Sequence, residues 1–153
     1  MKWKTPPGCT TPYGHCSVDK DFSDNTEGKI DINRHLFSKG IIAPAPSRIL
    51  FPLDLKYRSF MACIGISKET TEDKNCGVKS GDAKFRVLGD GKTLKINGDK
   101  WTTKDFSEDA ACFQLDIGNV SILELETKYR SHVTTCAYST WANAAVALKG
   151  MGL

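Results

Sequence analysis

The sequence predicts an all-β fold, an antiparallel jelly-roll-like β-sandwich of about eight strands. Apolar and polar residues alternate with a period of two from Ile30 onward, and Gly, Pro, Asn and Asp interrupt the alternation at short intervals. Both features are typical of short antiparallel strands, and no stretch shows the 3.6-residue period of an amphipathic helix. With 153 residues, the chain has the length of one compact domain, so we expect a single domain over residues 1–153.

The predicted strands follow one another from residue 28 to residue 148. Residues 1–27 are rich in Pro, Gly, Thr and Asp and are expected to be mostly loop. The eight strands are expected at 28–33, 47–55, 59–66, 83–89, 92–97, 111–117, 121–127 and 141–148. Their alternation predicts a core that contains Phe60, Ile64, Phe85, Val87, Phe113, Leu115, Leu123 and Leu125. Glu124 and Glu126, which alternate with core residues, are expected to face water.

The direction of consecutive strands predicts where a binding site lies. Gly89-Asp90-Gly91 is the clearest hairpin turn, because glycine accepts a positive φ at no steric cost. If consecutive strands are antiparallel, this turn and the short connections 56–58 and 118–120 lie at one end of the sandwich. The long connections 34–46, 67–82, 98–110 and 128–140 then lie at the other end, which we call the long-loop end. Because long connections tend to carry function, a binding site is expected there.

Charge and hydrophobicity argue against a nucleic acid partner and against a membrane-spanning helix. The chain has 21 basic and 18 acidic residues, a net charge of +3, and the basic residues are scattered rather than clustered. Nucleic acid is therefore not an expected partner, because phosphate binding needs a concentrated basic face. Apolar stretches such as Ala142–Leu148, with Asn143 inside it, are far shorter than the roughly 20 residues of a membrane-spanning helix.

Six cysteines indicate an oxidising compartment. They are Cys9, Cys16, Cys63, Cys76, Cys112 and Cys136, and none forms a CxxC pair. We interpret them as up to three disulfides of a secreted or extracellular protein, the alternative being buried free thiols in a cytosolic one. Cys9 is expected to pair with Cys16. For the other four, we favour Cys63 with Cys76 and Cys112 with Cys136, and the alternative pairs Cys76 with Cys136.

Two further features bear on secretion. Asn119-Val120-Ser121 is an acceptor sequence for N-glycosylation, which predicts a glycoprotein. Residues 1–7 contain no apolar signal-peptide core, so we expect the chain to be one domain of a larger secreted protein.

Five motifs in series resemble a known family. They are Ile30–Asn33 leading to Phe37–Ile41, Ala45–Ile49 with Leu53–Leu55, Phe60–Ile66, Phe85–Lys92, and Trp141–Ala144. In their order and spacing the chain resembles the NPCBM family of carbohydrate-binding modules. The resemblance implies a galactose-binding-domain-like sandwich, found beside glycosidases and in secreted multidomain proteins, with a glycan or glycoprotein as its partner.

The sequence also departs from the family at polar positions. Where family members usually carry a histidine before the Ala-Pro-Ser stretch, this chain has Pro44. Around Trp141, where acidic or histidine residues are usual, it has Ala137, Tyr138, Ser139, Thr140 and Asn143. The alternative function is therefore an extracellular protein-interaction or structural domain that has lost the sugar site.

Candidate ligand-binding residues follow from the chemistry of sugar recognition. Sugar-binding modules pair an aromatic platform with a few groups that hydrogen-bond hydroxyls. The candidates at or beside the long-loop end are Trp101, Tyr138, His35, His132 and Asn143. Each has a structural alternative: Trp101 capping the core, Tyr138 and Asn143 packed against the sheet, and the histidines at the surface. Trp141 is expected to pack in the core.

No cofactor and no catalytic activity are predicted. An oxygen-rich stretch suits a structural calcium ion, but it lacks the glycine and the closing glutamate of an EF-hand loop and also fits a plain turn. This stretch comprises Asp19, Asp21, Ser23, Asp24 and Asn25. GxSxG, HExxH and P-loop motifs are absent from the sequence, and His15 beside Cys16 is only a chain neighbour. The sequence thus predicts a non-catalytic, secreted ligand-binding module.

Overall fold

The structure is a computed structural model of the 153-residue chain, and it describes residues 9–11, 16–19, 29–68, 82–129 and 137–150. Within these ranges the chain forms twelve strands and no helix, which confirms the predicted all-β class. The strands are β1 (Ser17–Val18), β2 (Ile30–Ile32), β3 (His35–Phe37), β4 (Gly40–Ile42), β5 (Ser47–Pro52), β6 (Tyr57–Ile66), β7 (Ala83–Gly89), β8 (Lys92–Leu94), β9 (Thr102–Lys104), β10 (Ala111–Asp116), β11 (Ile122–Tyr129) and β12 (Ser139–Leu148). No described segment is a helix of the length and apolarity needed to cross a membrane.

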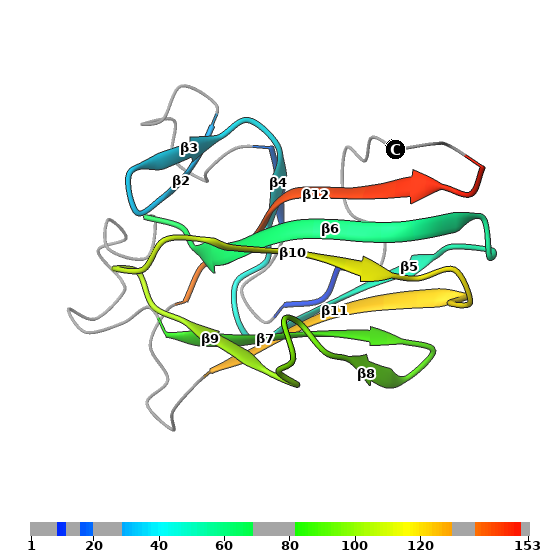
Figure 1. Cartoon of the computed structure of the whole chain (residues 1–153). Helices are drawn as coiled ribbons and strands as arrows, with labels where there is room; N and C mark the ends of the chain where they lie inside the picture. The colour runs from blue at the N-terminus through cyan, green and yellow to red at the C-terminus, as the bar shows by residue number, and fades with distance from the viewer. Residues whose placement is uncertain (1–8, 12–15, 20–28, 69–81, 130–136, 151–153) are drawn as a thin grey trace.

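Two antiparallel sheets lie face to face and form the predicted sandwich (Figure 1). One sheet, which we call the β6 sheet, has the strand order β1-β4-β12-β6-β10. The other, the β7 sheet, has the order β5-β11-β7-β8, with β9 also paired to β7. Strands β10, β11 and β12 alternate between the two sheets, as in a jelly roll. Strands β2 and β3 pair only with each other and form a separate hairpin.

Eight of these strands correspond to the eight segments that the sequence predicts. The other four, β1, β3, β4 and β9, lie in segments expected to be loop. Each has two or three residues, which is too short for a period of two to be recognised. They are stabilised by partners elsewhere in the chain: β4 pairs with β12, and β9 pairs with β7.

The main core lies between the two sheets. Seven of the eight residues predicted to lie inside are buried, namely Phe60, Ile64, Phe85, Val87, Phe113, Leu123 and Leu125. Leu115 is half-buried because it lies on β10, an edge strand of the β6 sheet. Trp141 of β12 is fully buried, as expected, and meets the ring of Phe85 edge to face at a centroid distance of 5.3 Å. This aromatic pair joins the two sheets, since β12 belongs to one and β7 to the other.

A smaller apolar cluster covers the outer face of the β6 sheet. Ile30 and Ile32 of the β2–β3 hairpin are fully buried there. Their buried neighbours on the sheet are Ile42, Cys63 and Ala142. Beneath the hairpin both faces of the β6 sheet are therefore covered, which fits the unbroken apolar sequences of β4 and of the end of β6.

In the described residues the two ends of the sandwich differ as strand direction predicts (Figure 1). Most of the long connections 67–82 and 128–140 lies outside the described residues. The β5–β6, β7–β8 and β10–β11 turns lie at one end, on the right in Figure 1. The β2–β3 hairpin and the connection from β9 to β10 lie at the other, the long-loop end. In the β7–β8 turn, Asp90 and Gly91 have φ values of 49° and 83°. These positive values are those that a tight hairpin turn requires.

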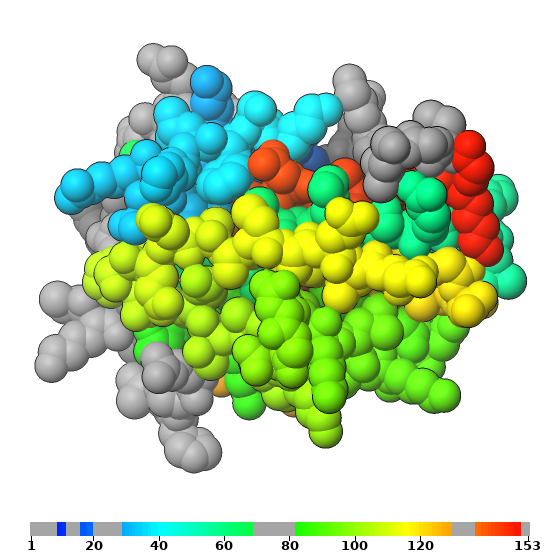
Figure 2. All heavy atoms as spheres, in the orientation of Figure 1, coloured from blue at the N-terminus to red at the C-terminus, as the bar shows by residue number. Residues whose placement is uncertain are grey.

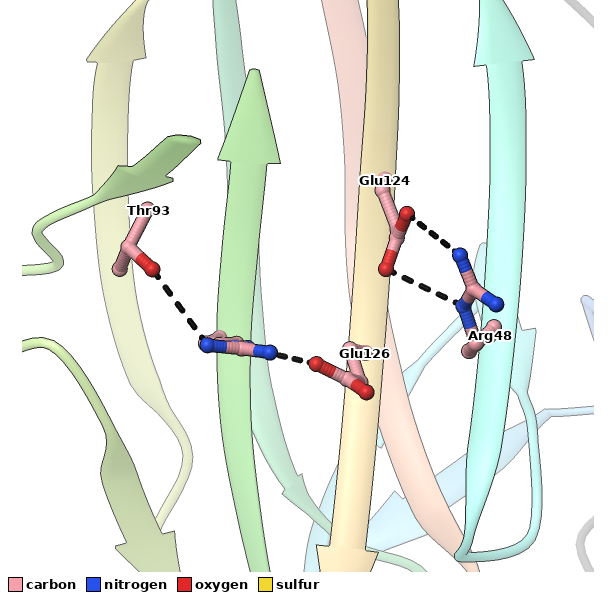
Figure 3. A network of polar contacts seen from close by, with 5 residues as sticks. Arg48, Thr93, Glu124 and Glu126 are labelled. Carbon is pink, nitrogen blue, oxygen red and sulfur yellow. Dashed lines mark hydrogen bonds and ion pairs between the residues drawn. The ribbon is translucent and has the colours of Figure 1, made fainter. Parts of the chain in front are cut away.

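The outer face of the β7 sheet is charged (Figure 3). Arg48 donates two hydrogen bonds to Glu124, at 3.2 and 2.9 Å, and this hydrogen bonding together with the negative charge of Glu124 raises the pKa of Arg48 above its ordinary value. Arg86 donates to Glu126 at 2.5 Å and to Thr93 at 3.5 Å. Glu126 is only 8% exposed because the side chain of Arg86 covers it. The expectation that Glu126 faces water is therefore wrong, although its side chain does point away from the core.

The described cysteines form two disulfides. Cys9 is bonded to Cys16, as predicted. Cys63 is bonded to Cys112, so the favoured pairs Cys63–Cys76 and Cys112–Cys136 are wrong. The reason is the strand register: Cys63 and Cys112 lie directly opposite each other on β6 and β10, with their Cα atoms 3.9 Å apart. Cys76 and Cys136 lie outside the described residues.

Peptide mapping without reduction tests this pairing. Trypsin is expected to release the segments 59–68 and 105–128 as one linked species, because they carry Cys63 and Cys112. Reduction should separate them into two peptides, which serves as the control. Recovery of Cys63 linked to Cys76 would contradict the observed register.

Candidate functional site

A groove at the long-loop end runs between the β2–β3 hairpin and the start of β10. Its volume is about 420 Å³. It is lined by His35, Leu36, Phe37, Asp109, Ala110 and Cys112. In Figure 2 the hairpin (blue to cyan) lies directly against the segment that leads into β10 (yellow-green). We call this feature the hairpin groove.

The turn of the hairpin places His35 at the groove. Asn33 and Arg34 have φ values of 48° and 71°, and two consecutive positive values allow a two-residue connection between β2 and β3. The Asp31 carboxylate accepts a hydrogen bond from the Arg34 amide at 2.9 Å, which holds the turn closed. His35 is the first residue of β3 after this turn.

The polar side of the groove is built around Asp109. Its Oδ1 atom accepts a hydrogen bond from Asn33 Nδ2 at 2.7 Å and lies 3.5 Å from His35 Nε2. The backbone oxygen of Asp109 accepts a hydrogen bond from Lys104 Nζ at 2.9 Å. The side chains of His35 and Asp109 are 65% and 68% exposed. Both groups are thus held in place while their remaining hydrogen-bonding capacity faces solvent.

The apolar side of the groove comes from β3. Leu36 lines the groove and is 55% exposed, so its apolar side chain is accessible there. Phe37 is half-buried, because it packs against the outer apolar cluster together with Ala110 and Tyr138. Apolar side chains beside a carboxylate and an imidazole suit a ligand with both C–H faces and hydroxyl groups.

The structure brings only part of the predicted site together. His35 lines the groove, and Tyr138 lies beneath it, half-buried against the same cluster as Phe37. Asn143 is exposed at a bulge of β12, with φ of 51°, and its amide donates to the Lys39 carbonyl at 2.9 Å. Its role there is that of a residue that tolerates left-handed backbone. His132 lies outside the described residues.

Trp101 occupies a different face of the molecule. It lies just before β9, and β9 pairs with β7, so the 98–110 connection crosses the β7 sheet before it reaches β10. The ring of Trp101 contacts Lys84, Arg86 and Lys128 on the outer face of that sheet. The structure therefore does not bring Trp101 and Tyr138 together, because they lie on the outer faces of different sheets.

Four residues that complete the groove are not marked by any pattern in the sequence. Asn33, Leu36, Phe37 and Asp109 all lie in or beside connections assigned to the long-loop end. Of these four, only Asp109 could have been recognised from the sequence, because it is an acidic residue at the end of a long connection. Its proximity to His35 depends on the docking of the hairpin, and sequence spacing does not report that docking.

The candidate calcium stretch is mostly outside the described residues. Asp19 is described, and its Oδ1 atom accepts a hydrogen bond from the Gly40 amide at 2.9 Å. Asp21, Ser23, Asp24 and Asn25 are not described. In the part of the chain that is described, no group of three or more His, Cys, Asp or Glu residues could hold a metal ion.

A larger groove lies at the opposite end of the sandwich. It has a volume of about 550 Å³ and is lined by Arg58, Ser59, Gln114, Leu115 and Asp116. It contains no aromatic residue, whereas the hairpin groove contains Phe37 and the predicted His35. For a sugar ligand, which needs an apolar ring contact as well as hydrogen bonds, the hairpin groove is the better candidate despite its smaller volume.

Solved structures with the same fold come from bacterial multidomain proteins. The CBM51-2 module of Clostridium perfringens ZmpB, in a structure with GlcNAc and INT domains, has a TM-score of 0.72 and 20% identity over 97% of this chain and 30% of that chain. The CBM51 of Clostridium perfringens GH95, in complex with methyl-galactose, has a TM-score of 0.66 and 18% identity over 95% and 94% of the two chains. The tandem CBM51 modules of Sp3GH98 from Streptococcus pneumoniae SP3-BS71 have a TM-score of 0.65 and 19% identity over 97% and 45%. At these identities the likeness concerns the fold.

Sequence comparison places the chain in a family. No curated protein matches the chain in sequence. Residues 3–147, nearly the whole chain, match the sequence profile of the NPCBM/NEW2 domain. The five motifs from Ile30 to Ala144 lie within this match. The chain therefore belongs to the NPCBM/NEW2 domain family.

Proposed function

We propose that this chain is an extracellular, non-catalytic carbohydrate-binding module. Its membership of the NPCBM/NEW2 domain family is the observation that carries this proposal. The fold adds support, because structures with GlcNAc and with methyl-galactose are known for modules of the same architecture. We further propose that the hairpin groove is the saccharide site and that its ligand is a neutral hexopyranose.

The chemistry of the groove supports a sugar. Leu36 and Phe37 offer apolar surface to the C–H face of a pyranose ring, while Asp109 and His35 can hydrogen-bond its hydroxyl groups. A concave site with an aromatic wall favours a sugar over a protein partner, which would require a flat apolar patch of several hundred Å². Among the exposed large apolar residues of the described chain, Leu36 is the one that lines the hairpin groove, which is too little for such a patch.

The same groove argues against hydrolysis of the sugar. Glycosidases commonly place two carboxyl groups on opposite sides of the scissile bond. Among the described residues that line the groove, Asp109 is the one carboxylate, and it is already bonded to Asn33. The groove is therefore suited to binding and not to general acid and base catalysis.

An extracellular location and a larger parent protein complete the proposal. Two disulfides in the described chain are typical of an oxidising compartment. The chain spans 30% of one ZmpB structure and 14% of another, so similar modules occur within longer proteins. We propose that residues 1–153 form a single domain of this kind. Asn119 of the sequon is exposed in the β10–β11 turn, at the end opposite the hairpin groove, where a glycan would leave the groove open.

Titration with methyl-galactose and GlcNAc, supported by a glycan array, tests the saccharide site. We expect millimolar binding of at least one of the two sugars. Asp109→Asn should weaken this binding about tenfold, because a hydrogen bond to a charged group contributes roughly 1.5 kcal/mol or more. Isothermal titration calorimetry measures both values.

A matched substitution at the opposite end serves as the control. Asp54→Asn makes the same chemical change at an exposed residue of the β5–β6 turn, where φ is 53° and asparagine is tolerated. It should leave the affinity unchanged. If neither sugar binds and the array is blank, the protein-interaction function replaces this proposal. Equal effects of the two substitutions would place the site outside the groove.

A further inference from the structure

Three cationic side chains surround one aromatic ring on the outer face of the β7 sheet. The Arg86 Cζ atom lies 4.4 Å from the centroid of the Trp101 ring, Lys84 Nζ lies 4.7 Å from it, and Lys128 Nζ lies 5.7 Å from it. All three distances are within the range of a cation–π interaction. We call these four residues the Trp101 patch.

The charge of the patch is only partly compensated. Arg86 is paired with Glu126 at 2.5 Å. Lys84 of β7 and Lys128 of β11 lie directly opposite each other in the strand register. Within the described part of the chain, neither lysine has an anionic side chain within 4.0 Å; their charges meet only the ring of Trp101. The patch and Glu126 together therefore carry two net positive charges.

The pairing of Lys84 with Lys128 does not stabilise the sheet. Like charges directly opposite each other on neighbouring strands repel, whereas an opposite pair stabilises a sheet. The rest of the same face follows the second pattern, because Arg48 is paired with Glu124 and Arg86 with Glu126 (Figure 3). The unpaired lysines are thus an exception on a face that otherwise neutralises its charges, and an anion between them would remove the repulsion.

We infer that the Trp101 patch is a second binding site, for a saccharide that carries a sulfate or carboxylate group. Lys84 and Lys128 bind the anionic group, and the half-buried indole of Trp101 provides the apolar surface against which the sugar ring packs. The site lies on the sheet opposite the hairpin groove and takes a different class of ligand.

A neighbouring groove gives this site room for more than one sugar. It has a volume of about 180 Å³, and Lys128 of the patch is one of its lining residues. Its other lining residues are Thr10, Pro46, Ser47, Arg48, Glu126 and Thr127. An oligosaccharide whose anionic residue lies at the patch can therefore extend across β11 towards β5.

The surrounding acidic residues favour a single anionic group over a nucleic acid. Glu124, Glu126 and Lys128 follow one another at two-residue intervals on the outer face of β11, so a row of phosphates would meet carboxylates next to the lysines. Nucleic acid binding requires several neighbouring phosphate contacts on a continuous basic surface. One sulfate or carboxylate needs only the two lysines.

Lactose, 3′-sulfolactose and 3′-sialyllactose form the probe set. They share one disaccharide and differ in the anionic group, so the gain from the charge is measured directly by calorimetry at 50 mM salt. We expect 3′-sulfolactose or 3′-sialyllactose to bind at least tenfold more tightly than lactose, and the gain to shrink at 200 mM salt. The sulfated and sialylated probes distinguish a sulfate from a carboxylate as the preferred group.

Two double variants locate the effect. Lys84→Gln with Lys128→Gln should abolish the gain and leave lactose binding unchanged. Lys56→Gln with Lys92→Gln removes the same charge from exposed residues at the other end and should retain the gain. All four substitutions lie at the surface or half-buried, and urea unfolding verifies that the midpoints are unchanged. Trp101→Ala, as a third variant, should weaken binding of the anionic probe without affecting lactose.

Several outcomes would overturn the second site. These are equal affinities of the native protein for the three probes, retention of the gain in the Lys84 and Lys128 double variant, or sodium sulfate binding as tightly as 3′-sulfolactose. Tighter binding of an eight-residue oligothymidylate would mean a nucleic acid site instead. Asp109→Asn separates this inference from the proposed function. If it abolishes lactose binding but keeps the gain from the anionic group, the neutral site lies in the hairpin groove and the second site stands. The two proposals can therefore fail independently.

Discussion

Replacing Phe85 by alanine is expected to lower the free energy of unfolding by about 3–5 kcal/mol. Phe85 is fully buried in the centre of β7 and packs edge to face against Trp141 of the opposite sheet. The substitution leaves a cavity between the two sheets and removes the ring contact that joins them. Urea denaturation followed by tryptophan fluorescence measures the loss from the shift of the midpoint.

Met61 provides the matched control for a large side chain on a central strand. It lies on β6 but points outward and is 48% exposed. Met61→Ala should change the free energy of unfolding by less than about 1 kcal/mol. If Phe85→Ala also lowers the free energy of unfolding by less than about 1 kcal/mol, Phe85 lies on the solvent side of β7 and not in the core.

Gly40→Ala is expected to destabilise the protein by about 3 kcal/mol or more. A Cβ atom at this position would lie 2.8 Å from the Cα of Ala142 and 2.9 Å from the carbonyl oxygen of Trp141. Both are backbone atoms of β12, which pairs with β4 here, so neither can move without disturbing the β6 sheet. The φ of +152° adds strain for any residue other than glycine.

A second glycine separates the steric cost from the backbone cost. Gly91 in the β7–β8 turn has φ of +83°, and an added Cβ would meet no atom within 4 Å. Gly91→Ala should therefore cost only about 1 kcal/mol, from the positive φ alone. Thermal and urea unfolding of the two variants compare the costs. Similar values would contradict the close approach of β4 to β12.

The sequence predicts the fold well wherever a strand is half-buried over several residues. The alternation in β7, β10 and β11 reflects one apolar face on the core and one polar outer face, so it is visible without knowledge of the partners. Strands β4 and β9 leave no such trace, because two or three residues owe their conformation to a distant strand that pairs with them. Residue types could not reveal those pairings.

The candidate site was predictable only to the level of one end of the sandwich. Strand direction places His35 at the long-loop end, and the structure places it in the hairpin groove. Strand direction also places Trp101 near that end. Because β9 pairs with β7, however, this residue lies on the outer face of the β7 sheet and not in the hairpin groove. The Cys63–Cys112 bond follows from the register of β6 and β10 in the same way. Register and docking depend on long-range contacts, which a single sequence does not encode as a local pattern.

The separate apolar cluster under the β2–β3 hairpin has a consequence for how recognition diverges. Ile30 and Ile32 anchor the hairpin from its inner side, whereas Leu36 projects outward and takes no part in the packing between the sheets. Substitutions at the outward positions of β3 can therefore reshape one wall of the groove at little cost in folding free energy. The opposite wall, tied to β6 by the Cys63–Cys112 bond, stays constant. Under the proposal that the hairpin groove binds the sugar, relatives that share this scaffold change their sugar preference through a few neighbouring codons, without remodelling the sandwich.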